Sequence, residues 1–220
     1  VNGDPLGLVY EISGGGAHGK VVALKAHRDL NLWYRTGLPY DEIHPEDPNN
    51  VGVIARSETD GQENMKAYKQ IPDWKTHYPV AAYVSDLNDE NGNPGWYLPA
   101  IKEVQAMVGW VDGAVLSPDG EAGQEPSEAM KEKRKAINQL IVDNGGNEFY
   151  FYGYDVSFII DQTNAWEADY FNRIYTSTET DYQVHPMVFK FYLRNGWWET
   201  MHVYGDLAGS YGEVRPFLAF

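Results

Sequence analysis

The sequence predicts an α+β fold, and two observations support this class. Apolar residues at helical spacing lie in the first two thirds of the 220-residue chain, and alternating apolar residues dominate the last third. We therefore expect helices first and a twisted antiparallel sheet in the last third. The length suits one domain, so residues 1–220 are predicted to form a single unit with loop insertions near 36–64 and 111–127.

The first predicted element is a β-hairpin. Residues 7–12 (GLVYEI) and 20–26 (KVVALKA) are β-rich runs, and the SGGGAHG segment between them is typical of a turn. The polar, acidic stretch that follows, residues 36–64, is predicted to be a solvated loop. Calcium binding by its DEIHPEDPNN segment is the alternative to a plain loop.

The first of three predicted helices begins at Pro79, because proline suits the first turn of a helix. One face of this helix is apolar at positions i, i+3, i+4 and i+7, and its residues are Val80, Tyr83, Val84 and Leu87. The segment DLNDENGNPG is predicted to be a turn-rich connector. It does not match an EF-hand loop, because asparagine stands where that loop requires glycine.

The second helix is predicted to begin near Ala100, with Pro99 at its first turn and an apolar stripe of Ile101, Val104 and Val108. The third spans about residues 128–143 and carries a KEKRK run, which we expect to face solvent. Four apolar residues of this helix are expected to pack inward: Met130, Ile137, Leu140 and Ile141. The following NGG segment is predicted to form a left-handed cap.

The last third is predicted to be rich in strands. Its clearest hairpin is MVFKFYLRNGWWETMHVY (187–204), in which Asn195 and Gly196 form the two-residue turn. The adjacent Trp197 and Trp198 cannot both face the core of a regular strand, because successive side chains point to opposite faces. At least one of them is therefore expected to be exposed, at an edge or in an interface. The apolar terminus VRPFLAF is predicted to return as a strand.

The composition excludes several classes of function. A net charge of −15 argues against a nucleic-acid partner. The sequence has no run of 18 apolar residues, so we expect no membrane insertion of this segment. The absence of cysteine excludes disulfides, thiol catalysis and cysteine-ligated zinc or iron–sulfur sites. No phosphate-binding loop, nucleophile elbow or zinc-binding histidine motif is present, so we expect no cofactor and no metal.

Aromatic residues are the most unusual feature of the chain. It has 7 Trp, 16 Tyr and 8 Phe, and residues 149–220 hold 20 of these 31 residues. Exposed Trp and Tyr supply rigid contact area, so a ligand-binding surface is the favoured function. Two alternatives stay open: a carbohydrate-active enzyme that uses Glu199 or Asp206, and a structural subunit of an envelope or pilus assembly.

Three segments, in order, resemble one bacterial family. GWYLPAIKEVQAM (95–107) is similar to its W-x-L-P-x-x-x-E-L signature, YTSTE (175–179) to its Y-W-S-S-T-E block, and VRPFLAF (214–220) to its terminal V-R-x-V-x-x-F. The opening hairpin is similar as well. The chain thus resembles the Lcl-type adhesin C-terminal domains, also called the major paralogous domain, of bacterial surface proteins and lipoproteins. It departs from them at Thr176, where tryptophan is usual.

This resemblance implies a C-type-lectin-like fold, shared with formylglycine-generating enzymes and with variable proteins of diversity-generating retroelements. Formylglycine chemistry needs cysteine, so that activity is excluded here. The resemblance implies instead a non-enzymatic, adhesin- or receptor-like module that binds a protein or glycan, with diversification by a retroelement as a further hypothesis. The ligand-binding residues it implies are Tyr182, Trp197, Trp198, Glu199, His202, Tyr204, Asp206, Ser210 and Tyr211.

The signature residues of the family are expected to be structural. They are Trp96, Leu98, Pro99, Glu103, Ser177, Thr178, Glu179 and Arg215. Glu103 and Arg215 are predicted to form an ion pair that ties the second helix to the terminal strand. The resemblance also implies a location at the bacterial cell surface or outside the cell, with any lipid anchor in a region beyond this chain.

Overall fold

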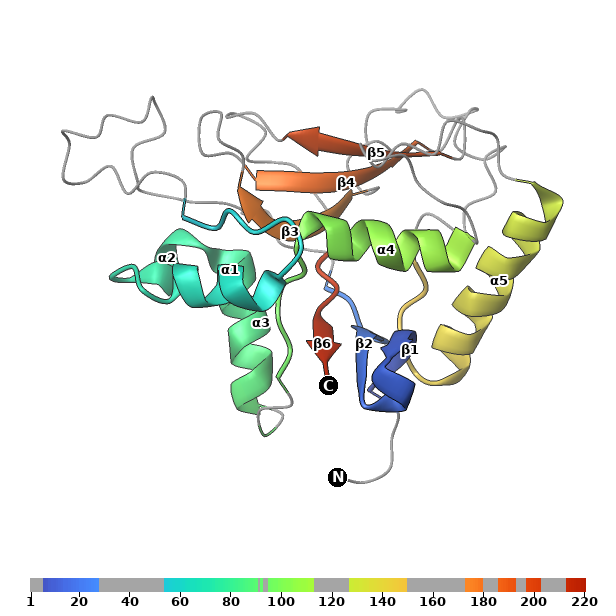
Figure 1. The fold of residues 1–220 in the computed structure, drawn as a ribbon, viewed down its shortest axis with the longest axis horizontal. Helices are drawn as coiled ribbons and strands as arrows, with labels where there is room; N and C mark the ends of the chain where they lie inside the picture. Colours follow the sequence, from blue (N-terminus) through green and yellow to red (C-terminus); the bar gives the residue numbers. More distant parts are fainter. Residues whose placement is uncertain are drawn as a thin grey trace.

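A computed structural model describes residues 6–27, 54–90, 92, 95–112, 127–149, 173–179, 186–192, 197–202 and 213–220. The described part is a mixed α+β structure, which confirms the predicted class (Figure 1). Its strands are β1 (Gly7–Ser13), β2 (His18–Ala23), β3 (Arg173–Glu179), β4 (Pro186–Tyr192), β5 (Trp197–His202) and β6 (Phe217–Ala219). Its α-helices are α1 (Gly61–Tyr68), α2 (Trp74–His77), α3 (Pro79–Glu90), α4 (Ile101–Asp112) and α5 (Glu128–Asp143).

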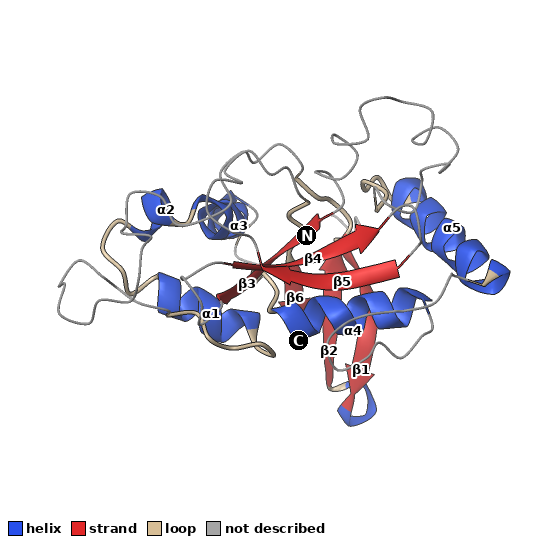
Figure 2. Ribbon diagram, turned by 90° about the horizontal axis from the view of Figure 1, so that it is seen from above, coloured by secondary structure: helices blue, strands red, loops and turns tan. Residues whose placement is uncertain are grey.

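The strands form two antiparallel sheets, with orders β1-β2-β6 and β3-β4-β5. The prediction of one sheet in the last third is therefore incomplete, because the N-terminal hairpin and the C-terminal strand build a second sheet. Helix α4 lies between the two sheets, α1 to α3 lie on one side of them and α5 on the other (Figures 1 and 2). The core fills the space between these layers, and the apolar stripe of α4 is completely buried in it.

The opening hairpin is confirmed. Strands β1 and β2 pair from Gly7 with Ala23 to Ser13 with His18, and a short 3-10 turn over Gly14–Gly16 joins them. All three glycines of this turn have positive φ angles, which glycine adopts without the penalty that a Cβ would bring. The predicted terminal strand is confirmed too, because β6 pairs with β2, placing Phe217 opposite Val22.

The register of β4 and β5 differs from the prediction. Tyr192 lies opposite Trp197, whereas a two-residue turn at Asn195 and Gly196 would place Arg194 there. The pairing is therefore shifted by two residues. The hairpin itself is present, and residues 193–196 lie outside the described part of the chain.

The segment before α3 is more ordered than its polarity suggested. The predicted loop 36–64 ends early, because α1 begins at Gly61, and α2 follows it. Asp60 caps α1 by accepting a hydrogen bond from the backbone N–H of Glu63 at 3.0 Å. The D-x-x-E spacing at this cap resembles a capping box and was the overlooked signal for the helix. Residues 36–53, and with them the calcium candidate, lie outside the described part.

Helix α3 begins at Pro79 as predicted. Val80 and Val84 are buried, but Tyr83 and Leu87 are only half-buried, because the inward face continues through Ser85. The helix also runs on to Glu90, so the first half of the predicted connector is helical. The predicted burial of this face is therefore correct at two of its four positions.

Helix α5 is present over the predicted range, but its buried face is rotated. The buried positions are i, i+3, i+4 and i+7, occupied by Arg134, Ile137, Asn138 and Ile141. Leu140 is 48% exposed, so its predicted burial is wrong, and Arg134 of the KEKRK run is buried instead of solvated. Gly145 and Gly146 close the helix with N–H bonds to Val142 and Ile141, the pattern of a left-handed cap, as predicted.

No helix in the described ranges is long and apolar enough to cross a membrane.

Candidate functional site

Four of the nine predicted binding residues lie in one strand of the described part of the chain. Trp197, Trp198, Glu199 and His202 belong to β5, which is the edge strand of the β3-β4-β5 sheet. This strand lies at the end of the molecule opposite to β1, β2 and β6 (Figure 1). The other predicted binding residues lie outside the described part: Tyr182, Tyr204, Asp206, Ser210 and Tyr211.

The opposite edge of this sheet, β3, is fixed by three separate segments of chain. The backbone N–H of Tyr175 donates to Glu213 at 3.0 Å, that of Ser177 to Pro99 at 2.7 Å, and that of Glu179 to Ala55 at 2.8 Å. Alternate backbone N–H groups of β3 thus donate to three carbonyl groups from different parts of the chain. The sheet is anchored on the β3 side and presents β5 at its other edge.

The side chains of β3 reinforce this anchor. Ser177 accepts a hydrogen bond from the Asn64 amide at 3.0 Å, and its carbonyl accepts one from the Tyr68 hydroxyl at 2.6 Å. Glu179 accepts from the backbone N–H groups of Ile54 and Ala55 at 3.0 and 3.2 Å. Because these groups are largely buried, their pairing removes the desolvation penalty that they would otherwise impose.

The start of α4 is capped from a distant part of the chain. Ala100 stands at the capping position and has no side-chain oxygen. The hydroxyl of Thr178 instead accepts the N–H of Ile101 at 3.0 Å, and Glu103 accepts the N–H of Ala100 at 2.9 Å. The two bonds of this capping arrangement thereby come from segments 77 residues apart in the sequence.

Glu103 is the centre of a buried polar cluster. Its Oε2 also accepts the backbone N–H of Gly61 at 3.0 Å, and its Oε1 accepts the Tyr97 hydroxyl at 2.8 Å. Lys20 supplies the cation, with its Nζ 2.8 Å from Oε1. The predicted ion pair between Glu103 and Arg215 is therefore wrong, because each of these residues pairs with a charge closer to it in the fold.

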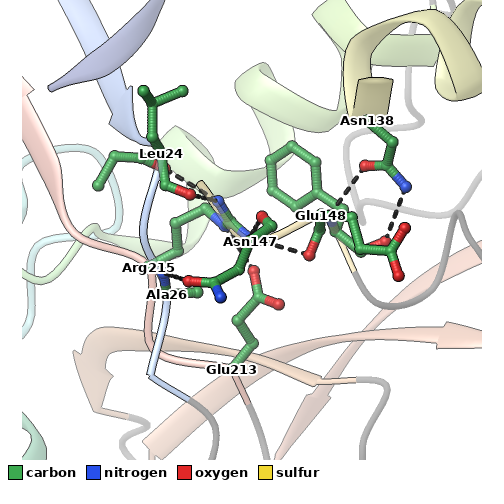
Figure 3. A network of polar contacts seen from close by, with 9 residues as sticks. Leu24, Ala26, Asn138, Asn147, Glu148, Glu213 and Arg215 are labelled. Carbon is green, nitrogen blue, oxygen red and sulfur yellow. Dashed lines mark hydrogen bonds and ion pairs between the residues drawn. The ribbon is translucent and has the colours of Figure 1, made fainter. Parts of the chain in front are cut away.

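Arg215 occupies a second buried network, shown in Figure 3. Its side chain is completely buried and forms an ion pair with Glu213. The four N–H groups of its terminal nitrogens donate to the carbonyl oxygens of Ala23, Leu24, Asn147 and Glu148. With the Nε bond to Glu213, all five guanidinium donors are satisfied. The guanidinium also lies 4.2 Å from the centre of the Phe149 ring, within cation–π range.

Asparagine side chains bridge several of these segments, and the sequence did not point to them. Asn88 of α3 both donates to and accepts from the backbone of Trp96, at 2.6 and 2.7 Å. Asn138 of α5 does the same for the backbone of Phe149. Both lie on the inward face of an amphipathic helix, where a polar residue at an apolar position was the available signal.

Two buried tyrosines lie near Glu103. Burial, and secondly the charge of Glu103, raise the pKa values of Tyr10 and Tyr97 well above the usual value for a phenol. The Tyr97 hydroxyl donates a hydrogen bond to Glu103, whereas the Tyr10 hydroxyl is buried without a hydrogen-bond partner. Both phenols therefore stay protonated and neutral in the folded protein.

The arrangement is suited to holding a sheet rigid. Trp96, Leu98, Glu103, Ser177, Thr178, Glu179 and Arg215 are all buried, and Pro99 contributes its carbonyl group. Within the described ranges, no three or more His, Asp or Glu side chains are placed to hold a metal ion. No family model, curated protein or solved structure matches the chain.

Proposed function

We propose that this chain is a non-enzymatic ligand-binding module of a bacterial cell surface, adhesin- or receptor-like, with a C-type-lectin-like fold. It binds a protein or glycan through the aromatic-rich surface of β5 and the segments that flank it. One observation carries the proposal: the three sequence blocks behind the family resemblance interlock, and together they anchor the sheet that has β5 at its other edge.

The contacts between the blocks support treating them as one signature. Tyr97 of the first block forms a β-bridge with Phe217 of the third, and Ile174, next to the second block, forms one with Glu213, next to the third. Thr178 of the second block caps the helix that begins in the first. Residues that form one interlocked core are expected to occur together in a family, since losing one contact weakens the others.

Three buried carboxylates are unsuited to act as catalytic acids. Glu103, Glu179 and Glu213 are each at most 6% exposed and hold backbone or cationic groups of the protein itself. A catalytic acid must reach its substrate within hydrogen-bond distance, which these three groups do not permit. The enzyme alternative thus depends on Glu199 or Asp206, and Glu199→Gln is the variant that tests it in a hydrolysis screen against broad glycan substrates.

The binding test compares the protein with a variant that has Trp197, Trp198 and Tyr204 all replaced by alanine. Immobilised glycans and bacterial and host surface proteins are screened for a ligand of the parent chain. We expect the variant to lose that ligand, because aromatic anchors contribute most of the energy at such surfaces. Trp74→Ala is the matched control, since Trp74 is half-buried on α2, away from β5. Undiminished binding by the triple variant would reject the site.

The retroelement hypothesis has its own test in the gene's neighbourhood. A reverse transcriptase gene beside a near-copy of the codons for residues 180–220 would support diversification of this surface. Neighbouring sequence with neither feature would remove diversification from the proposal and leave ligand binding as it stands.

A further inference from the structure

The outer face of the β1-β2-β6 sheet is apolar across all three strands. Residues opposite each other in an antiparallel sheet share a face, as do residues two apart on a regular strand. The rows of this face are Gly7 with Ala23, Val9 with Val21 and Leu218, and Ile12 with Gly19 and Phe220. The bulge in β1 at residue 10 keeps Val9 and Ile12 on the same side. None of the eight positions has a polar side chain.

The other face of this sheet is turned toward the core. Its central row is Leu8, Val22 and Phe217, and the last two have no exposed surface. Lys20, two residues from Val22 on β2, reaches Glu103 of α4 from the same face. The core and α4 therefore lie on that side, and the apolar rows point away from them.

The apolar rows are exposed to solvent. Val9 is 44% exposed, Phe220 is 50% exposed, and Ile12, at 67%, is the most exposed large apolar side chain in the described part of the chain. Val21 and Leu218 between them are half-buried. A solvated face of an antiparallel sheet is normally polar, and a contiguous exposed apolar patch marks an interaction site.

Two aromatic rings limit this face. A Cβ atom on Gly7 would lie 3.3 Å from the Trp96 ring, and one on Gly19 would lie 2.5 Å from the Phe220 ring. Both glycines thus leave room for a ring that lies against the sheet. Trp96 is itself buried and closes the face at the Gly7 end, so the open part extends from Val9 to Ile12 and Phe220.

We infer that this open face is an interface between two copies of the chain, packed sheet against sheet about a two-fold axis. A two-fold contact places a surface against a copy of itself, so a net charge on that surface would repel its own copy. This face has no charge, although the chain has 17 basic and 32 acidic residues. Two apolar sheet faces pack at a separation of about 10 Å, with their side chains interdigitated.

Pairing of the two sheets edge to edge fits the structure less well. Strand β1 is an edge of its sheet, but its bulge between Val9 and Glu11 interrupts the regular row of backbone groups that such pairing needs. Edge pairing would also leave the apolar rows in water. Face-to-face packing removes Val9, Ile12 and Phe220 from water together. Because β5 lies at the opposite end of the molecule, such a dimer leaves both β5 edges free (Figure 1).

The size of the face and the charge of the chain set the expected strength. Three strands about 4.8 Å apart, with six residues at about 3.3 Å each, give at most about 300 Å² in plan. A standard stable interface buries about 800 Å² per partner, so we expect a weak dimer with a dissociation constant of roughly 10–500 µM. The net charge of −15 on each copy opposes association, and added salt screens this repulsion.

The first experiment is sedimentation equilibrium of the whole chain from about 5 to 500 µM. We expect a monomer–dimer equilibrium whose dissociation constant falls about threefold or more between about 50 and 500 mM NaCl. A constant that rises with salt would overturn an uncharged contact, because it would indicate ion pairs across the interface.

The second experiment compares Ile12→Glu with Leu140→Glu. Leu140 is 48% exposed on α5, so its variant adds the same charge to the chain outside the proposed interface. We expect Ile12→Glu to weaken dimerisation at least about tenfold, because each copy brings a charge into the contact, and Leu140→Glu to stay within about threefold. Ile12→Thr, which adds no charge, should weaken it by about threefold.

Thermal melts check that the variants fold. The Tm of Ile12→Glu should stay within about 2 °C of the parent, since its side chain is largely exposed. A parent chain that stays monomeric up to about 500 µM would overturn the inference and leave the face to another protein or domain. Equal weakening by Ile12→Glu and Leu140→Glu would also overturn it, because the dimer would then use another surface.

Discussion

Replacing Arg215 with methionine is expected to remove much of the stability of this protein. The guanidinium is completely buried, and its five donors hold Glu213 and four backbone carbonyls from two other segments. Methionine keeps a similar apolar volume but leaves Glu213, 1% exposed, without that cation. Breaking a buried pair in this way costs about 3–5 kcal/mol, against a total stability of about 5–15 kcal/mol for a typical domain.

The measurement is urea denaturation followed by circular dichroism, with thermal melts in parallel. At roughly 2–4 °C for each kcal/mol, Arg215→Met should lower the Tm by about 6–20 °C. Arg215→Lys keeps the charge but has only three donors, so we expect an intermediate loss.

A double variant provides the sharper control. Glu213→Leu combined with Arg215→Met removes both charges, so its loss of stability should be smaller than the sum of the two single losses. Additive losses, or an Arg215→Met variant within about 0.5 kcal/mol of the parent, would refute the reasoning that a desolvated charge dominates the cost.

Three further predictions concern the cluster around Glu103. Thr178→Val should lower the unfolding free energy by about 1–2 kcal/mol in urea, because the cap on Ile101 is lost, and Thr178→Ser should retain it. Tyr10→Phe should raise the unfolding free energy by up to about 1 kcal/mol, because the buried hydroxyl of Tyr10 has no hydrogen-bond partner. Tyr97→Phe should lower it by about 1–2 kcal/mol, because the bond from the Tyr97 hydroxyl to Glu103 is lost. Shifts of the Tm in the same direction for both variants would count against this contrast. The pKa values of Tyr10 and Tyr97 are raised on folding, so the stabilisation that comes from their neutral form is complete below about pH 10. Above about pH 10 the unfolding free energy should fall by about 1.4 kcal/mol for each of the two groups and each pH unit. A flat unfolding free energy above about pH 10 would contradict this prediction.

The structure also shows which parts of the fold were predictable. The opening hairpin, the start of α3, the stripe of α4 and the glycine cap of α5 were right, since each depends on residues close together in sequence. The buried face of α5 was predicted incorrectly because Leu140 was assumed to be inside on hydrophobicity alone. In the fold, Asn138 bonds the backbone of Phe149, which turns that side of the helix inward.

For the candidate site, the grouping of its residues on one strand was predictable, but the register of that strand was not. Four of its residues belong to one edge strand, and adjacency in the sequence was enough to group them. The register was not predictable from the Asn195–Gly196 pair, because the pairing of β4 with β5 is set by the whole sheet and not by one turn. That register places Trp197 opposite Tyr192 and Trp198 opposite Phe191.

By itself, the sequence determined the α+β class, several of the local elements and the absence of cysteine chemistry, because periodicity, turn residues and composition act over short stretches of chain. Only the tertiary structure decided which buried charges pair. Glu103 pairs with Lys20, and Arg215 pairs with Glu213. The predicted pair of Glu103 with Arg215 also joins opposite charges, so the signs of the charges alone could not distinguish the two arrangements. The physical reason is distance: a buried ion pair requires contact, and Lys20 of β2 meets Glu103 of α4 only after the chain has folded. The carbonyl groups that satisfy the rest of the Arg215 guanidinium are as distant as Ala23, 192 residues away, so they too are brought to it only by folding.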